Sequence, residues 1–372
     1  MFLTIIYVVV LFFVVFSFLV IIHEMGHYLM ARAFDVDIEI FSIGLGPKVV
    51  GFTRNRTLYQ LAAIPLGGYV KLAGTDPEAT PGSGASERWF IAKPVWKRAL
   101  IILAGPAMNI IVAGVIFYGA FAVVGEGVPT QVVATVTPPS PAGIAGMRPG
   151  DVIIQINKKP MERWSDIKKT IVGSQGAPLT ITVLRSSAQH ELRVTPILSK
   201  FRKSISEVGS EYRIGIQVHL EQRHVDPFRG TIQTVKRVVD ISLRMLNALR
   251  LLLTGQLPAH TIGGPILMAY QADHHANKGP GALIAFIAII SLSLAIMNLL
   301  PIPMLDGGIL FFLIVEFFRG RPLTPGAQRT FNVAGLTLIL MLMVGGVYFD
   351  VVRFFSGDPA GLQMIEELQR IK

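Results

Sequence analysis

Three ionisable residues follow a long uncharged run at the N-terminus. His23, Glu24 and His27 form an H-E-x-x-H motif, and residues 2–22 before it contain no Asp, Glu, Lys or Arg. On a helix, positions i and i+4 lie on one face, so the two imidazoles can bind one metal ion. The carboxylate beside them can activate a water molecule at that metal. Because ionisable groups are costly in a membrane segment, the motif predicts a functional metal site there.

The composition is typical of a membrane protein. Of the 372 residues, 51% are hydrophobic and only 16% are charged, which is less charge than soluble domains carry. Cysteine is absent from the sequence, which excludes a disulfide framework and a thiolate metal site. The net charge is +10, and the basic residues gather beside apolar segments. This pattern favours contact with membrane lipid and argues against nucleic-acid binding.

Four segments are long and apolar enough to cross the hydrocarbon core, which needs about 20 residues. The first runs from residue 2 into the metal motif, and the others cover residues 99–125, 279–305 and 330–349. The first has no basic start and no small-residue cleavage site, so we expect an uncleaved span rather than a signal peptide. Lys and Arg gather after the first span and between the third and fourth, which predicts that these parts face the cytoplasm. The motif then lies near the cytoplasmic side, with both termini and the middle region outside.

Catalytic zinc usually has three protein ligands and one open position. The strongest candidate for a third ligand is Asp306, which ends the third apolar segment on the same side as the motif. Pro301 and Pro303 break the helix before it, and Gly307 and Gly308 allow backbone to approach closely. The alternative role for Asp306 is that of an ordinary carboxylate at a helix end.

Two regions outside the spans predict β-structure. Residues 36–74 alternate apolar runs with Gly and Pro, which indicates a small sheet dipping into the bilayer or an ordinary cytoplasmic hairpin. Residues 130–197 contain four strand-like runs and the stretch A-G-x-x-G-M-R-P-G-D-V-I-x-x-I-N, which begins at Ala142. This stretch resembles PDZ domains of bacterial envelope proteases. The resemblance implies a domain that captures peptide ends or extended strands, with a plain spacer as the alternative.

The remaining features have simpler interpretations. Residues 236–257 predict an amphipathic helix at the membrane surface or beneath the soluble domain. Residues 76–86 predict a turn-rich linker, and residues 356–372 predict a short exposed helix. Asp273, His274 and His275 can be considered as a metal site, but they lie on the membrane face opposite His23. Surface roles are expected for three further histidines without ligand spacing: His190, His219 and His224.

Two motifs together resemble the site-2 protease family of intramembrane zinc metalloproteases. They are H-E-x-x-H in the first span and N-x-x-P-x-P-x-L-D-G-G, which begins at Asn298, in the third. One inserted PDZ domain and four spans resemble the bacterial regulator-of-sigma-E protease branch of this family, and the resemblance covers nearly the whole chain. It implies one catalytic Zn2+ bound by His23, His27 and Asp306, with Glu24 as the general base.

The same resemblance implies further site residues. Asn298 is expected to position the substrate or to stabilise the oxyanion. The P-L-G-G-Y-V stretch matches the edge strand proposed to pair with an unwound substrate helix, and a glycine-proline motif in the second span is expected near the site. The residues concerned are Gly67, Gly68 and Tyr69 in the strand, and Gly105, Pro106 and Asn109 in the span. Some relatives carry two PDZ domains, whereas this chain has room for one.

The expected protein is a polytopic α-helical membrane protein with four transmembrane helices, a re-entrant β-sheet and an inserted periplasmic α+β PDZ domain. Its expected segments are a first transmembrane helix (1–35), re-entrant sheet (36–74), cytoplasmic linker (75–98), second transmembrane helix (99–125), PDZ domain (126–200), strand and amphipathic helix region (201–278), third transmembrane segment (279–308), cytoplasmic loop (309–329), fourth transmembrane helix (330–352) and tail (353–372).

The resemblance implies regulated intramembrane proteolysis in the bacterial inner membrane. The expected substrates are single-span membrane proteins, such as anti-sigma factors or remnant signal peptides, and the PDZ domain is expected to contact a peptide or the substrate ectodomain. One alternative is a metal transporter with a peripheral PDZ domain, which requires acids or histidines in several spans. The other is a catalytically inactive PDZ scaffold, against which the joint presence of Glu24, His23, His27 and Asp306 argues.

Overall fold

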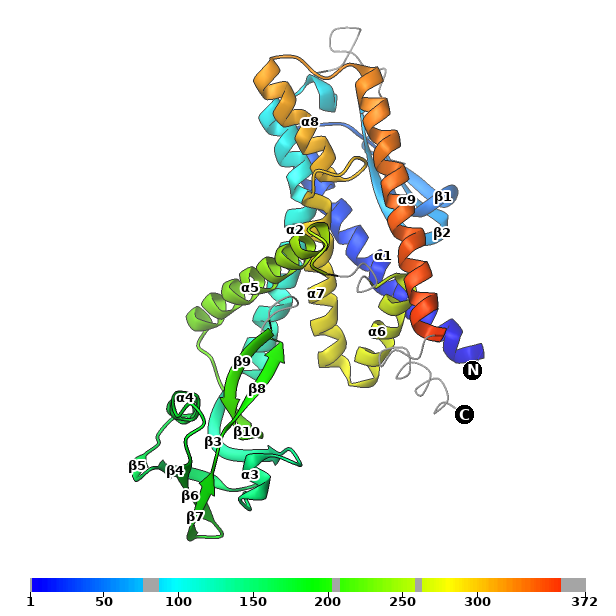
Figure 1. Ribbon diagram of the computed structural model, residues 1–372. Helices are drawn as coiled ribbons and strands as arrows, with labels where there is room; N and C mark the ends of the chain where they lie inside the picture. The colour runs from blue at the N-terminus through cyan, green and yellow to red at the C-terminus, as the bar shows by residue number, and fades with distance from the viewer. Residues whose placement is uncertain (1, 76–86, 203–207, 258–262, 356–372) are drawn as a thin grey trace. The chain divides into compact units, whose positions relative to one another are not determined.

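The computed structural model describes residues 2–75, 87–202, 208–257 and 263–355, which form two compact units (Figure 1). The first unit contains residues 1–118, 234–247 and 258–372, and the second contains residues 119–233 and 248–257. The predicted linker at 76–86 and the predicted tail helix at 356–372 lie outside the described residues.

Among the described residues, four helices are long and apolar enough to cross a membrane. They are α1 (Phe2–Ala33), α2 (Val95–Val124), α7 (Pro280–Leu299) and α9 (Pro325–Phe355). Each coincides with one of the four predicted spans, so the chain is a polytopic membrane protein. Helix α1 continues without a break through the metal motif to Ala33, which keeps both motif histidines on one helical face.

The chain after α7 differs from the prediction. Helix α7 ends at Leu299, before Pro301 and Pro303, because proline cannot continue a helix. Asp306 does not end the third apolar segment, because it is the first residue of α8 (Asp306–Arg319). The expected loop at 309–329 is therefore helical as far as Arg319. A carboxylate in the first turn is favoured by the helix dipole, which explains why a new helix begins at this residue.

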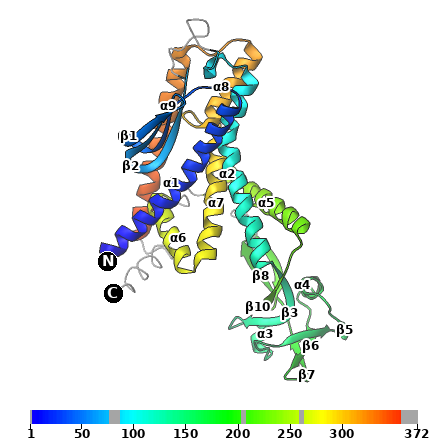
Figure 2. The same ribbon diagram turned by 180° about the vertical axis from the view of Figure 1, so that it is seen from behind.

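A long β-hairpin follows α1. Strands β1 (Ile38–Arg54) and β2 (Thr57–Leu72) pair antiparallel, and Phe41 of β1 lies opposite both Tyr59 and Val70 of β2. The middle of the sheet is therefore the start of β1, and the second half of β2 forms one edge. Strand β2 packs on α1, and the two lie side by side in both views (Figures 1 and 2).

The hairpin meets the helices through a small core at its base. The buried members of this core come from α1, the connection to β1, the two strands, the short 3₁₀ helix η1 (Phe90–Ala92), α2 and α8. They are Ala31, Val36, Ile38, Leu72, Phe90, Ile101, Ile102 and Leu313. Beyond this core the hairpin side chains are open, and Val49, Val50 and Phe52 are all at least 60% exposed.

The second unit is built on a twisted antiparallel sheet with strand order β10-β3-β4-β6-β7. Its strands are β3 (Glu126–Val136), β4 (Val152–Ile156), β6 (Leu179–Arg185), β7 (Ala188–Val194) and β10 (Ile216–Arg223), with the two-residue β5 (Lys159–Pro160) beside β4. Helices α3 (Pro141–Ile144) and α4 (Trp164–Gly173) contribute to its core, as does the segment before β10. Strands β8 (Ile197–Arg202) and β9 (Val208–Arg213) form a separate hairpin.

The predicted end of this domain at residue 200 is too early. Strand β10 pairs with β3, with Ile216 opposite Val136, so the sheet closes only at Arg223. The buried Ile214 just before β10 belongs to the same core as Ile153 and Ile181 of the central strands. The segment that follows the predicted domain is thus part of it, because its apolar residues complete the core.

In chain order, two helices follow the sheet domain and precede α7. Helix α5 (Pro227–Leu253) begins nine residues before the predicted amphipathic helix, because Asp226 accepts the Arg229 N–H at 3.0 Å and caps it. Helix α6 (Pro265–Asn277) packs on α1, α7 and α9. Near its end α9 holds a buried acid, Asp350, whose carboxylate accepts the backbone N–H groups of Gly264, Ile266 and Leu267 at the start of α6. This acid therefore anchors α6 to α9.

Candidate metal centre

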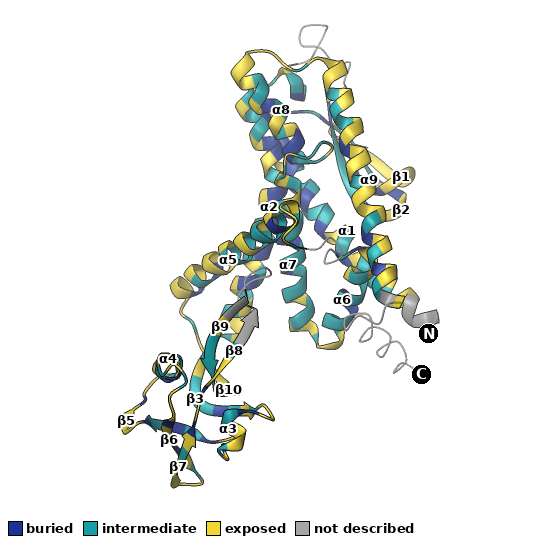
Figure 3. Cartoon of the chain, in the orientation of Figure 1, coloured by how far each residue is buried: buried dark blue, intermediate teal, exposed yellow. Residues whose placement is uncertain are grey.

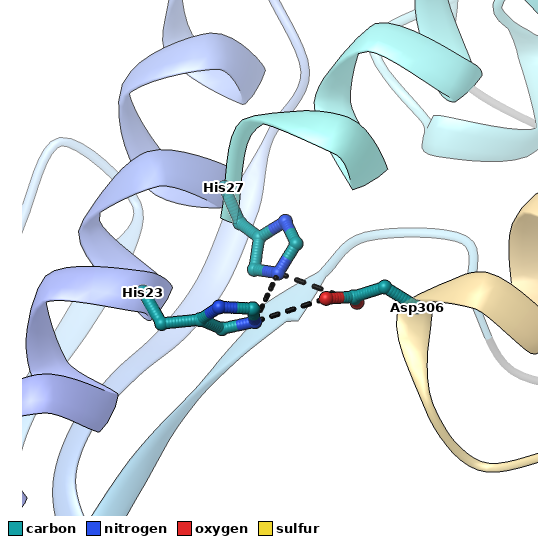
Figure 4. A group of neighbouring side chains, drawn as sticks. All are labelled: His23, His27 and Asp306. Atoms are coloured by element: carbon teal, nitrogen blue, oxygen red, sulfur yellow. Dashed lines mark hydrogen bonds and ion pairs between the residues drawn. The ribbon is translucent and has the colours of Figure 1, made fainter. Parts of the chain in front are cut away.

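The two motif histidines face each other across one turn of α1 (Figure 4). Their Nε2 atoms are 3.2 Å apart, and His23 and His27 are 6% and 7% exposed. Two imidazoles on one buried helical face present their nitrogen lone pairs to the same point.

Asp306 brings a carboxylate to the same point from the start of α8 (Figure 4). Its Oδ2 lies 2.9 Å from His23 Nε2, and its Oδ1 lies 3.4 Å from His27 Nε2. The tight path between α7 and α8 positions this carboxylate. A side chain on Gly308 would come within 2.5 Å of the Ile302 carbonyl oxygen, so the chain passes there only with glycine.

These three residues fit a zinc ion. The ligands of a tetrahedral zinc with bonds of about 2.0–2.1 Å lie about 3.3 Å apart. The nearest atoms of the three side chains are separated by 2.9–3.4 Å, and one ligand atom from each lies within 4.8 Å of the others. Asp306 Oδ2 is buried, and apart from its 2.9 Å contact with His23 Nε2 it accepts no hydrogen bond from the described residues. A buried anionic oxygen with so few partners is costly, and a cation at this point would satisfy it. In the described part of the chain, no other group of three or more His, Asp or Glu side chains is close enough together to bind a metal.

Helix α2 supports both imidazoles from the other side. His27 Nδ1 lies 2.9 Å from the Ile101 carbonyl oxygen, and Asn109 Nδ2 lies 3.4 Å from His23 Nδ1. Gly105 lies between them, and a Cβ there would overlap His27 and approach His23 Cε1 to 2.8 Å. Buried residues gather on this part of α2 and at the start of α8 (Figure 3). Gly105 and Pro106 are both buried, and the missing side chain at Gly105 lets the two rings contact the helix.

Glu24 and the predicted oxyanion residue Asn298 share a small cavity with this cluster. The cavity has a volume of about 180 Å³, and Asn298 Nδ2 lies 3.4 Å from His23 Nε2. Glu24 Oε2 accepts the backbone N–H of Val70, on the edge half of β2, at 2.9 Å. The lining residues are Val20, His23, Glu24, Asn109, Leu294, Asn298, Met304, Leu305 and Asp306.

The predicted strand residues are close to α1 but are not all in the cavity. The Gly67 N–H donates to Ser17 Oγ at 3.0 Å, and a Cβ on Gly68 would approach the Ser42 carbonyl oxygen to 2.6 Å. The Tyr69 hydroxyl instead accepts a hydrogen bond from Gln60 within the sheet. The strand therefore meets the site through its backbone, and the residue that does so, Val70, was not among the predicted site residues.

Comparison with known proteins identifies the family. The family model described as Peptidase family M50 matches residues 11–342. The chain belongs to this family. The M50 chain is 35% identical to a candidate zinc metalloprotease of Agrobacterium fabrum, over 92% of this chain and 95% of that protein. It is 32% identical to a candidate zinc metalloprotease of Clostridium acetobutylicum, over 91% and 95%. It is 28% identical to the zinc metalloprotease RasP of Oceanobacillus iheyensis, over 93% and 99%.

The M50 chain is thus a metalloprotease with a zinc cofactor. The side chains of α6 that were considered as a second metal site have other contacts. His274 stacks on Tyr270 and His275 on Phe286, while Asp273 accepts a hydrogen bond from Asn277. Burial, Lys278 and His274 together lower the pKa of His275.

Proposed function

We propose that this M50 peptidase cleaves peptide bonds inside the transmembrane segments of single-span membrane proteins. In this proposal His23, His27 and Asp306 are the zinc ligands and Glu24 is the general base. The observation that supports it most is the shared cavity of about 180 Å³, in which Glu24 lies beside the three-residue cluster, with Glu24 and both histidines on the apolar helix α1. A catalytic group at this depth has access to bonds that are hidden from soluble proteases.

The chemistry divides among three groups. Zinc in such a site lowers the pKa of water to about 7 and polarises a carbonyl oxygen. Glu24 takes the proton of the attacking water and later delivers it to the nitrogen of the leaving amine. Asn298, whose amide lies 3.4 Å from His23 Nε2, donates a hydrogen bond to the developing oxyanion.

A substrate helix must unwind before it can be cleaved, because its carbonyls are held in internal hydrogen bonds. Free backbone groups are costly in lipid, so the unwound segment needs a partner. The edge half of β2 supplies one, with Gly67, Gly68 and Tyr69 in the strand and Val70 bonded to Glu24. We infer that the substrate pairs with this edge as an added strand, which presents its scissile carbonyl to the cavity.

We also propose the topology. The chain is a multi-pass protein of the bacterial inner membrane, with both termini and the sheet domain in the periplasm and the metal centre near the cytoplasmic side. The distribution of Lys and Arg supports this orientation. The exposed Val49, Val50 and Phe52 of the hairpin support a sheet that dips into lipid as the re-entrant element. The proposed segments follow the order predicted from the sequence, except that the sheet domain extends to Arg223 and the cytoplasmic loop after Asp306 is partly helical.

The second unit is proposed to be a PDZ domain that holds an extended peptide of the substrate ectodomain. A groove of about 510 Å³ is lined by α4, the start of β10 and the β8–β9 hairpin, with Trp164, Ile216 and Tyr212 among its lining residues. Among the described strands, β10 pairs only with β3, so its other edge is open to a peptide strand.

The test is cleavage of a single-span substrate by the zinc-loaded protein in lipid vesicles. General-base catalysis contributes about 10²–10⁴-fold, so E24Q should lose at least about a hundredfold in cleavage rate while it keeps its zinc. E191Q makes the same change at the exposed Glu191 of β7 and should cleave at the native rate. Cleavage by E24Q at the rate of E191Q would refute the role of Glu24.

A further inference from the structure

Helices α1 and α2 meet at the metal centre in an antiparallel register. His27 contacts the carbonyl of Ile101, and His23, one turn earlier on α1, contacts Asn109, two turns later on α2. Ile101, Gly105 and Asn109 are spaced by four residues and so lie on one face of α2. Each imidazole therefore has its own partner on α2, with Gly105 leaving room between them.

Asn109 is held firmly at this place. It is 0% exposed, and its backbone carbonyl accepts the hydroxyl of Ser291 on α7 at 2.8 Å. Ser291 is also 0% exposed. The Asn109 side chain has its Nδ2 facing His23 Nδ1, and its Oδ1 is buried without a hydrogen-bond partner among the described residues. A buried amide oxygen without a donor is costly, so the amide is not fully satisfied in this arrangement.

His23 can supply the donor that Asn109 Oδ1 lacks if His23 binds a metal through Nε2, the atom that faces Asp306. The Nε2 lone pair is then used, so the ring proton must be on Nδ1. A protonated Nδ1 is a donor and requires an acceptor opposite it, whereas Asn109 now presents its own donor. A half-turn of the amide about its last side-chain bond exchanges Nδ2 for Oδ1 at the same point.

We propose that Asn109 is a positioning residue of the zinc centre, whose amide oxygen accepts the Nδ1–H of His23 when the metal is bound. The inference rests on the proposed role of His23 as a ligand. Ile101 does the same for His27 with a backbone carbonyl, so the two histidines receive equivalent support. In metal-binding proteins such partners fix the tautomer and orientation of the ligating ring. Asparagine suits the position because its one amide can donate to the metal-free ring and accept from the metal-bound ring.

The test measures zinc affinity, by competition with a chromophoric chelator, on the full chain in detergent micelles. N109L and N109A remove the acceptor, and we expect each to weaken zinc binding about 10–100-fold. N109D keeps an acceptor but has no donor, and it should bind zinc at least as tightly as the native protein. H23A should abolish tight binding in the same assay, and thermal unfolding of each metal-free variant reports whether it folds.

The outcomes separate the role of His23 as a zinc ligand from the role of Asn109 as its positioning residue. If H23A binds zinc like the native protein, His23 is not a ligand and the proposed function is wrong at that residue. If H23A loses zinc but folded N109L or N109A binds within twofold of the native protein, the positioning role alone is wrong. Weaker binding by N109D than by N109A would also overturn it, because the amide would then act as a donor. Should N109L fail to fold, the comparison of N109A with N109D decides the question.

Discussion

The backbone N–H of Val70 donates a hydrogen bond of 2.9 Å to Oε2 of Glu24. This bond joins the edge half of β2 to α1 beside the two histidines of the metal centre. Earlier in the same strand, the Gly67 N–H donates to Ser17 Oγ, and the Ser17 hydroxyl donates to the Pro65 carbonyl. The edge strand is therefore fixed to α1 through backbone groups, at the position where a paired substrate would meet the proposed general base.

Proline at Val70 tests this contact. V70P removes the N–H that Glu24 accepts, and proline is tolerated at a strand edge when its nitrogen points away from the paired strand. We expect V70P to cleave a single-span substrate about tenfold more slowly than V70A, because a hydrogen bond to a charged group contributes about 1.5–3 kcal/mol. V70A keeps the N–H and controls for loss of the side chain. Equal rates for the two variants would show that the bond has no part in catalysis.

Alanine at Gly105 tests the packing of α2 on the histidines. A Cβ there lies 2.8 Å from His23 Cε1 and overlaps His27, so at least one ring must move. We expect G105A to lose zinc affinity by at least about tenfold, as when a partner of a ligand is disturbed. G119A makes the same change farther along α2, where a Cβ meets nothing within 4 Å, and should bind zinc normally. Normal zinc affinity in G105A would contradict the observed contact.

The pair of the buried Arg98 and the half-buried Glu316 ties α2 to α8. Arg98 donates to both carboxylate oxygens, at 3.0 and 2.5 Å, and also to the Lys93 carbonyl. Removal of one member of a buried pair costs about 3–5 kcal/mol, because the other charge is left uncompensated. R98M should therefore lower the free energy of unfolding by about that amount in detergent.

A paired replacement and a surface pair serve as controls for R98M. R98M combined with E316M leaves no buried charge and should recover much of the stability. R244M breaks the exposed pair of Arg244 and Asp240 on α5 and should cost less than about 1 kcal/mol. If R98M costs no more than R244M, the pair does not hold α8 in place.

The sequence predicted the parts of this protein that have a local signature. The uncharged runs marked the four spanning helices, and the spacing of His23 and His27 predicted their common face. Asp306 was found because a carboxylate in an apolar stretch is conspicuous. Its place at the start of α8 was not predicted. The two prolines before it indicated where α7 ends, and gave no sign that a helix begins again so soon.

The remaining features depend on backbone groups or on distant pairing. The Ile101 carbonyl is a group that every residue has, and the Val70 N–H is one that every residue except proline has, so no residue type marks them. Strand β10 pairs with β3 far earlier in the chain, and its alternating polar residues resemble an ordinary surface segment. Such contacts are fixed only when the whole fold brings the two segments together.

Acid should destabilise the sheet domain through Asp151. Burial acts to raise the pKa of Asp151, but hydrogen bonds from Arg185 and from the Arg148 N–H outweigh it and hold the pKa below its usual value. A lowered folded-state pKa contributes stability above the ordinary pKa near 3.8, and this contribution is lost as the pH falls through the lower folded-state value.

D151N should remove that contribution at neutral pH. We expect it to lower the stability of the sheet by about 2–3 kcal/mol and to weaken the acid dependence below pH about 4. Hydrogen exchange of the peptides that cover β4 and β6 measures both effects. D166N, at an exposed acid of α4, should change exchange little. Unchanged exchange in D151N would mean that the pair with Arg185 contributes no stability.

The position of the cut tests cleavage inside the membrane most directly. The zinc-loaded protein and a single-span substrate are placed together in lipid vesicles, and the masses of both products give the new termini. We predict that these termini lie within the apolar segment of about 20 residues, and that E24Q yields neither product. Termini confined to the polar flanks of the substrate would contradict intramembrane cleavage by this metal centre.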